Sequence, residues 1–336
     1  MKSIRIIFLV LLCISFVGVV FLFGFLAAGK QIDLPGADRD LVKALDQSWK
    51  VDDYISIEFD SNPLDIFITV NPAVKDIHVS CYQYEDWDVN VKDDNKNLYI
   101  SAPGRNSNHT FFWYGIRKSP YFSVEIPEDF DGVLKLQTQS GDIEMKGNFS
   151  ANTIQMTTSS GDVHLDDMTA KLISLKCMSG DIFFRELIGE RIDIETSSGE
   201  VTGGKIDSDM HIKTMSGDLK IKELAGCGEI STSSGEIELG TFTQMQGNVS
   251  LETSSGEIDV KNFDILGGDL SLISLSGDIA IFFNEKPDAS VEGKTNSGEL
   301  HIFKSRYNRS VRLEDHAASY QIWVETSSGD IRLRHG

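Results

Sequence analysis

The chain has 336 residues, with 51 Asp and Glu against 31 Lys and Arg, and a formal net charge of −20. Phosphate binding needs clustered basic residues, so this balance argues against a nucleic-acid partner. An anionic membrane surface would repel the acidic part of the chain for the same reason.

The N-terminus carries Lys2 and Arg5 and then an uncharged apolar run from Ile6 to Ala28. A helix of this length covers the roughly 30 Å hydrocarbon core of a bilayer. A cleaved signal peptide normally has a shorter apolar region, so we favour an uncleaved signal anchor over residues 1–30. The charges before the run predict a single-pass membrane protein with a cytoplasmic N-terminus and its bulk extracytoplasmic, in the cell envelope.

Residues 31–132 lead from this anchor to a repeat region. Residues 31–50 predict a juxtamembrane linker with a short helix near residues 40–45. From 51 to 132, segments of alternating polarity predict irregular strands and first coils. A stack of coils needs such a cap against edge-to-edge association.

An aromatic run within the cap region, residues 111–114, does not fit an alternating strand. One interpretation is a loop that folds over the cap as additional core. The alternative is a surface patch for a partner, a ligand or the membrane interface.

Residues 133–336 repeat one phrase: alternating apolar residues, a small polar residue, Ser-Gly-Asp or Ser-Gly-Glu, and a second apolar alternation. The phrase recurs at spacings of about 18 to 21 residues, except for a last gap of about 31. The alternation changes parity at each glycine, which indicates a corner, and glycine can take a positive φ there without cost. The corner glycines are Gly141, Gly161, Gly180, Gly199, Gly217, Gly235, Gly256, Gly277, Gly298 and Gly329.

A strand, a tight corner, a second strand and a return of roughly ten residues make one coil of a parallel β-solenoid. Fixed periods in this range are typical of stacked repeats. We therefore predict an all-β fold: a single-stranded, right- or left-handed parallel β-solenoid of about 20-residue coils. The predicted transmembrane helix precedes it.

Stacking places equivalent residues of successive coils in columns. The position three residues before each glycine is Thr, Cys or Ser, and we define it as the Thr column. This column and the serine before each glycine have inward parity. We expect both to fill the narrow corner, with hydroxyls bonded along the stack or to the backbone.

The residue after each glycine is acidic in every coil, and we define this position as the acidic column. Like charges about 4.8 Å apart repel by roughly 1 kcal/mol per pair even in water. Either the carboxylates accept hydrogen bonds from corner N–H groups, or divalent cations such as Ca²⁺ bridge adjacent coils. No other cofactor is expected. The column consists of Asp142, Asp162, Asp181, Glu200, Asp218, Glu236, Glu257, Asp278, Glu299 and Asp330.

The long last gap holds an insertion at 303–320 with a concentrated basic stretch that includes Arg306 and Arg309. We expect a solvated loop, and the alternative is docking against the acidic column or an anionic polymer. Basic residues on the final strand, such as Arg332 and Arg334, are expected to guard an open sheet edge.

No catalytic motif stands out. The seven histidines are scattered without HExxH, and there is no GxSxG elbow or Walker loop. Cys81, Cys177 and Cys227 lie far apart and predict neither a disulfide framework nor a metal site. A polysaccharide-active β-helix enzyme is the one enzyme class worth weighing, but an active site would break the repeat locally. We therefore expect no enzyme.

The run 121–130 leading into 134–144, with its Thr-x-Ser-Gly-Asp/Glu-Ile iterations, resembles the repeat entry of the bacterial putative-adhesin family, which includes LiaG-like proteins. The resemblance covers roughly residues 51–336. It implies a membrane-anchored or secreted β-solenoid in the bacterial envelope, and it carries over no catalytic residues.

The predicted function is a non-catalytic, membrane-anchored, adhesin-like scaffold that contacts an envelope protein or glycan. One alternative is an accessory role in envelope-stress sensing, and another is polymerisation through the solenoid ends. The partner-binding candidates are Phe111, Phe112, Trp113, Tyr114, Arg306 and Arg309.

Overall fold

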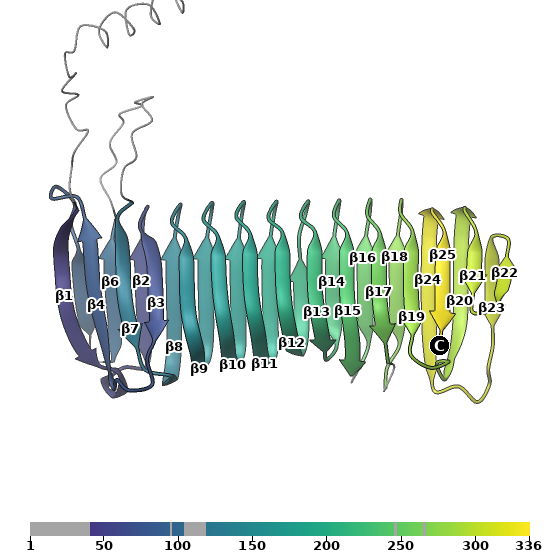
Figure 1. The fold of residues 1–336 in the computed structure, drawn as a ribbon, viewed down its shortest axis with the longest axis horizontal. Coiled ribbons are helices and arrows are strands. Elements are labelled where there is room, and N and C mark those ends of the chain that lie inside the picture. Colours follow the sequence, from purple (N-terminus) through teal and green to yellow (C-terminus); the bar gives the residue numbers. More distant parts are fainter. Residues whose placement is uncertain (1–40, 95, 104–118, 245–246, 265–266) are drawn as a thin grey trace, which may run out of the picture. The chain divides into compact units, whose positions relative to one another are not determined.

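A computed structural model describes residues 41–94, 96–103, 119–244, 247–264 and 267–336, which form 25 β-strands and one short 3-10 helix (Figure 1). At the N-terminal end lie β1 (Val42–Lys50), η1 (Val51–Asp53), β2 (Ser56–Ser61), β3 (Asp65–Val70), β4 (Asp76–Gln83), β5 (Asn90–Asp94), β6 (Asn97–Ala102) and β7 (Tyr121–Ile126). The following strands are β8 (Asp129–Thr138), β9 (Ile143–Thr158), β10 (Val163–Cys177), β11 (Ile182–Thr196), β12 (Val201–Lys213), β13 (Leu219–Ala225), β14 (Gly228–Thr232), β15 (Ile237–Gln244), β16 (Val249–Thr253), β17 (Ile258–Phe263), β18 (Leu270–Ser274) and β19 (Ile279–Phe283). The last are β20 (Ala289–Ser297), β21 (Leu300–Ile302), β22 (Ser305–Tyr307), β23 (Ser310–Leu313), β24 (Tyr320–Ser328) and β25 (Ile331–His335).

Each coil has a pre-corner arm, which ends at the Ser-Gly corner, and a post-corner arm, which follows it. Equivalent arms of successive coils pair in parallel and in register, as when Ile143 pairs with Val163, and Val163 with Ile182. Figure 1 shows these strands side by side, with the corners along one edge. The prediction of an all-β, long repetitive sheet is confirmed, and this arrangement is consistent with a β-solenoid.

Apolar residues of both arms form one continuous hydrophobic cluster. Ile154 and Met156 in a pre-corner arm and Ile143 and Met145 in a post-corner arm are all fully buried. Because the chain turns at the corner, the change of parity keeps both apolar sets inside. Burying one such side chain contributes about 1.5–3 kcal/mol, so the core stabilises the stack coil by coil.

The order of the coils along the stack differs from their order in the sequence at the C-terminal end. β24 pairs with β18 on one side and β20 on the other, and β25 lies between β19 and β21 in the same way. The chain therefore skips one position, builds the terminal coil, and returns to fill the gap. The long last spacing is the path of this return, and the expectation that Arg332 and Arg334 guard an open edge is wrong.

A similar displacement occurs at the N-terminal end. The coil of β2 and β3 lies between the coil of β6 and β7 and that of β8 and β9. Antiparallel strands then close the stack, because β5 covers β6, β4 covers β7, and β1 covers β4. The short helix expected near residues 40–45 is wrong, since Val42–Lys50 forms β1 within the predicted linker.

No helix in the described ranges is long and apolar enough to cross a membrane. The anchor predicted for residues 1–30 lies outside the described residues, and so does the aromatic run 111–114. Both stay predictions.

The inserted position of β24 and β25 predicts their hydrogen-exchange behaviour. Strands paired on both sides open only with their neighbours, so the amides of Ile322, Val324 and Ile331 should exchange as slowly as those of Ile173 and Ile194 mid-stack. Exchange mass spectrometry on the full-length chain measures this. The short cap strands β22 and β23 serve as the fast-exchanging reference, and equally fast exchange in β24 would contradict the inserted position.

Candidate functional site

The corner glycines are required by the close approach of two backbones. A Cβ on Gly161 would lie 1.8 Å from the carbonyl oxygen of Gly141, and one on Gly199 would lie 1.8 Å from that of Gly180. Any side chain there would force neighbouring coils apart. The positive φ expected at the corners is wrong, because within the described part of the chain the left-handed glycines, such as Gly147, lie outside the Ser-Gly corners.

The Thr column bonds each corner to the coil before it. The Thr158 hydroxyl accepts the N–H of Gly161 in its own corner (3.0 Å) and donates to the carbonyl of Gly141 in the preceding coil (3.4 Å). The Cys177 thiol makes the same two contacts one coil later. The serines before the glycines are exposed in every coil, so their expected inward position is wrong. In most coils the strand ends at the Thr column, for example at Thr138, and the alternation of buried and exposed residues ends there too.

In the acidic column, each aspartate holds the backbone of the next coil. Asp142 accepts the N–H of Asp162, and Asp162 that of Asp181, both at 2.9 Å. Asp65 begins the column, although its corner lacks Ser-Gly, and accepts the N–H of Asp142 (2.9 Å). The carboxylates thus act as acceptors for corner N–H groups, the first of the two expected arrangements. The aspartates that do so are Asp65, Asp142, Asp162, Asp181, Asp218, Asp278 and Asp330.

The glutamates of the column make no such bond to the next coil within the described residues. Glu200 and Glu299 instead contact the basic side chains of Lys220 and Arg306. Lys220 lies 3.2 Å from Glu200 and 3.5 Å from Asp218, and Arg332 binds Asp278 at 3.0 Å. Backbone N–H groups and these cations together offset the repulsion along the column.

The column therefore has a structural role that requires no metal. In the ranges that the structure describes, no group of three or more His, Cys, Asp or Glu side chains could hold a metal ion. Ca²⁺ needs six to eight oxygen ligands, whereas each coil supplies one carboxylate to the column.

The basic insertion forms cap strands, so the expectation of a solvated loop is wrong. β22 pairs antiparallel with β21, and β23 with β20. Arg306 binds Glu299, the acidic-column member of the terminal coil, which matches the docking alternative. The carbonyl of Arg309 accepts the N–H of Thr295 (2.8 Å). The other partner-binding candidates, Phe111, Phe112, Trp113 and Tyr114, lie outside the described residues.

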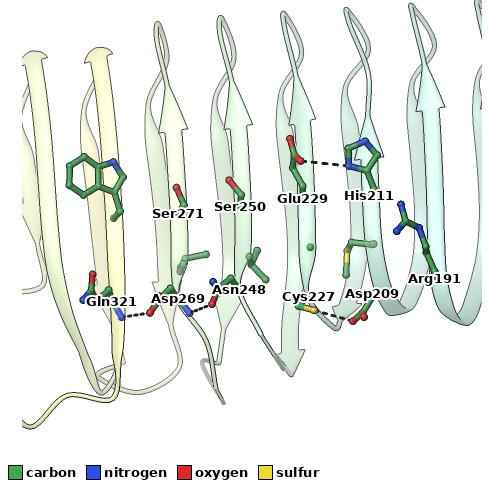
Figure 2. A pocket seen from close by; sticks show the side chains of 15 residues that line it. Arg191, Asp209, His211, Cys227, Glu229, Asn248, Ser250, Asp269, Ser271 and Gln321 are labelled. Carbon is green, nitrogen blue, oxygen red and sulfur yellow. Dashed lines mark hydrogen bonds and ion pairs between the residues drawn. The ribbon is translucent and has the colours of Figure 1, made fainter.

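A groove of about 630 Å³ crosses the outer face of the pre-corner arms (Figure 2). Successive coils from Arg191 to Trp323 supply its lining, and at about 4.8 Å per coil the five steps span about 24 Å. Ser250 in β16 and Ser271 in β18 face outward and lie between longer side chains. These small outward residues leave the hollow, and we call it the Arg191–Trp323 groove.

The polar side chains in the groove are fixed by the backbone. Asn248 accepts the N–H of Asp269 through Oδ1 (3.0 Å), and Asp269 accepts the N–H of Gln321 (2.9 Å; Figure 2). The acidic column uses the same arrangement at the corners. The Asn248 amide nitrogen and the Gln321 side chain have no hydrogen-bond partner among the described residues and remain available to a ligand.

The remaining groove residues favour binding over catalysis. The Cys227 thiol donates to Asp209 Oδ1 (3.0 Å), and burial, together with this bond, raises its pKa to about 11. A thiol with that pKa stays protonated near neutral pH and is a poor nucleophile. His211 lies 3.7 Å from the Glu229 carboxylate, and both side chains are part-exposed.

Sequence reasoning missed this groove. Its residues are separated by whole coils and meet only through the stacking register, as when Glu229 pairs with Ser250 and Ser250 with Ser271. Searches for local motifs do not detect such sets. Aligning the outward positions of successive coils would have shown a run of small residues that ends at Trp323.

The model of the family described as Toastrack DUF4097 matches residues 54–241 and 228–334. The chain belongs to the Toastrack family. This membership confirms the prediction that the chain belongs to a family of repetitive β proteins. The predicted likeness to LiaG-like proteins stays a prediction.

Solved structures similar to this Toastrack chain include a "putative adhesin" from Parabacteroides merdae, at TM-score 0.41 and 10% identity over 87% of this chain and 95% of that one. A "putative adhesin" from Bacteroides fragilis has TM-score 0.36 and 11% identity over 88% and 98%. A "putative cell adhesion protein" from Clostridium sporogenes has TM-score 0.21 and 10% identity over 87% and 100%. No curated protein matches the chain.

The close corner contact predicts a large cost for Gly199→Ala. The new methyl would lie 1.8 Å from the Gly180 oxygen, which belongs to backbone and cannot move alone. We expect the free energy of unfolding to fall by about 3 kcal/mol in chemical denaturation. Ser198→Ala, one residue earlier and exposed, is the control and should be nearly neutral. Equal stabilities for the two variants would disprove the contact.

We predict opposite effects on stability for two substitutions of Asp65. Burial raises the pKa of its carboxyl, the N–H of Asp142 lowers it, and the charge of Asp142 raises it again, with a net rise. The folded state then binds the proton more tightly than the unfolded state, so this group costs stability as pH rises through its raised pKa.

Asp65→Asn keeps an acceptor oxygen and removes the charge, so its melting temperature at pH 7 should match or exceed wild type. This advantage should disappear below pH 3.8, the ordinary pKa of an aspartate, because the carboxyl is then protonated in both the folded and the unfolded state. Asp65→Ala loses the acceptor and should melt lower at both pH values. A lower melting temperature for Asn than for Ala at pH 7 would contradict this assignment.

Proposed function

We propose that this protein is a non-catalytic, adhesin-like scaffold of the bacterial cell envelope, anchored by residues 1–30 and displaying its repeats outside the cytoplasm. The observation that carries the proposal is the Arg191–Trp323 groove, whose polar groups are held in place before any ligand arrives. Side chains fixed in advance lose little entropy on binding, which favours recognition. The groove is the contact surface.

The closed ends of the stack support binding through a face. At one end, β1 and β5 are mostly exposed and polar, and at the other β22 and β23 carry Arg306 and Arg312. Charged edge strands oppose pairing with another chain, and β22 and β23 are also short. Polymerisation through the ends is therefore not the function we propose.

The outer face of the pre-corner arms offers no unpaired backbone groups to a partner. The pre-corner arms that line the groove are paired on both sides, as β16 is with β14 and β18. Strand addition needs an unpaired edge, so a partner must bind to side chains. This explains why the chemistry of the outward columns determines the binding.

The proposal predicts that filling the groove abolishes partner capture. The double substitution Ser250→Arg and Ser271→Arg occupies the hollow, and both sites face outward, so folding should persist. Thr157→Arg in β9, exposed on the same face outside the groove, is the matched control. Full-length wild type and control should retain the same partners from envelope extract, read by mass spectrometry, and the double variant should lose them.

Equal capture by all three proteins would refute the groove as the contact surface.

Replacing residues 1–30 by an unrelated anchor separates scaffolding from stress sensing. Scaffolding should survive the replacement, whereas coupling through the anchor to a signalling partner should not.

A further inference from the structure

We propose that the Arg191–Trp323 groove binds an uncharged, linear glycan that lies along the axis of the stack. This inference rests on the proposed function and specifies the ligand of the same groove. Four features of the groove carry it: its length, its fixed polar groups, its one aromatic ring, and its charge.

The length of the groove fits a polymer. Six coils contribute to the lining, from Arg191 in β11 to Trp323 in β24, and they span about 24 Å at the spacing of paired strands. The small residues Ser250 and Ser271 keep the hollow open in the middle. A small metabolite would need an enclosed pocket, whereas a chain of similar units can lie along an open groove.

The polar groups of the groove fit a ligand rich in hydroxyls. Asn248, Asp269 and Gln321 follow one another in the stack, and Asn248 and Asp269 are each held by the N–H of the next coil. Amides offer both donors and acceptors and carboxylates offer acceptors, the two kinds of partner that a hydroxyl requires. Their spacing is set by the strands, so they present a regular row to a regular ligand.

Trp323 supplies the apolar contact. It pairs in register with Ser271 in β18 and is only partly exposed, so its ring borders the row of polar groups. A sugar ring has an apolar face of C–H groups and a rim of hydroxyls. An aromatic side chain beside fixed hydrogen-bonding groups complements both parts.

Charge and backbone pairing argue against a polyanion and against an added peptide strand. The groove contains the acidic residues Asp209, Glu229 and Asp269, and its one basic residue with a fixed charge, Arg191, is bonded to Asp193. The whole chain has a formal net charge of −20. A polyanion would be repelled from this surface. A peptide cannot add as a further strand, because the arms that line the groove are already paired on both sides.

The test is direct binding of the full-length protein in detergent to an array of neutral glycans, followed by titration calorimetry on the hits. Heparin, a polyanion, and a tetralysine peptide are the comparators. We expect a neutral oligosaccharide to bind, with affinity that rises with chain length until about 24 Å is covered and that is insensitive to salt.

Variants connect the binding to the groove. Trp323→Ala and Ser271→Arg should each weaken it at least about tenfold, Trp323→Phe should retain part of it, and Thr157→Arg should leave it unchanged. Circular dichroism reports on folding, and Ser271→Arg keeps the test valid if Trp323→Ala unfolds the protein.

Two results would overturn the inference: no neutral glycan on the array binds, or heparin or tetralysine binds more tightly than every neutral glycan. If no glycan binds but the Ser250→Arg and Ser271→Arg variant still loses a captured envelope protein, the glycan inference falls alone. If filling the groove changes neither measurement, the proposed function falls with it.

Discussion

Every coil depends on the contact between the backbone of its corner and that of the corner before it. The carbonyl of Gly180 sits where a Cβ of Gly199 would be, and this closeness allows the strands on both sides to pair at their normal distance. The hydroxyl of the Thr column and the carboxylate of the acidic column then satisfy the corner N–H groups. A buried or tightly packed corner would otherwise leave backbone donors unpaired, which costs about 1–3 kcal/mol each.

The repeat could be predicted from the sequence because the structural requirements of a corner are local. The parity change between Met156 and Val163 and the small residue at Thr158 follow from one corner and its two strands. The order of the coils could not be predicted in the same way. The corners of different coils share one pattern, so nothing near Gly298 or Gly329 tells which coil lies beside Gly277. The long spacing signalled an irregularity, and only the pairing of β24 shows that the last coil is inserted.

Inserting a coil at one end, and displacing another at the N-terminal end, has a physical benefit. The strands that finish the stack then arrive from loops and can run antiparallel, as β4, β5, β22 and β23 do. Short antiparallel strands with charged side chains end a sheet more safely than an exposed parallel coil. The basic residues near Arg306 therefore close the stack, which composition alone could not separate from a binding loop.

The same comparison of columns distinguishes structural from functional positions. A structural column meets an identical requirement in each coil, so it repeats one solution, as the aspartates from Asp142 to Asp181 do. A ligand that crosses several coils meets different atoms at each step, so its column must vary. The outward positions from Asp209 to Trp323 vary in this way, as outward positions do elsewhere in the stack: acidic, amide, hydroxyl and aromatic side chains follow one another on strands whose inward faces remain largely apolar. Substitutions at outward positions cost the fold little stability, because outward side chains do not set the spacing of the coils. In a repeat protein such as this one, the place to look for function is therefore the outer columns, which are free to vary, and not the corners, whose sequence the stacking fixes.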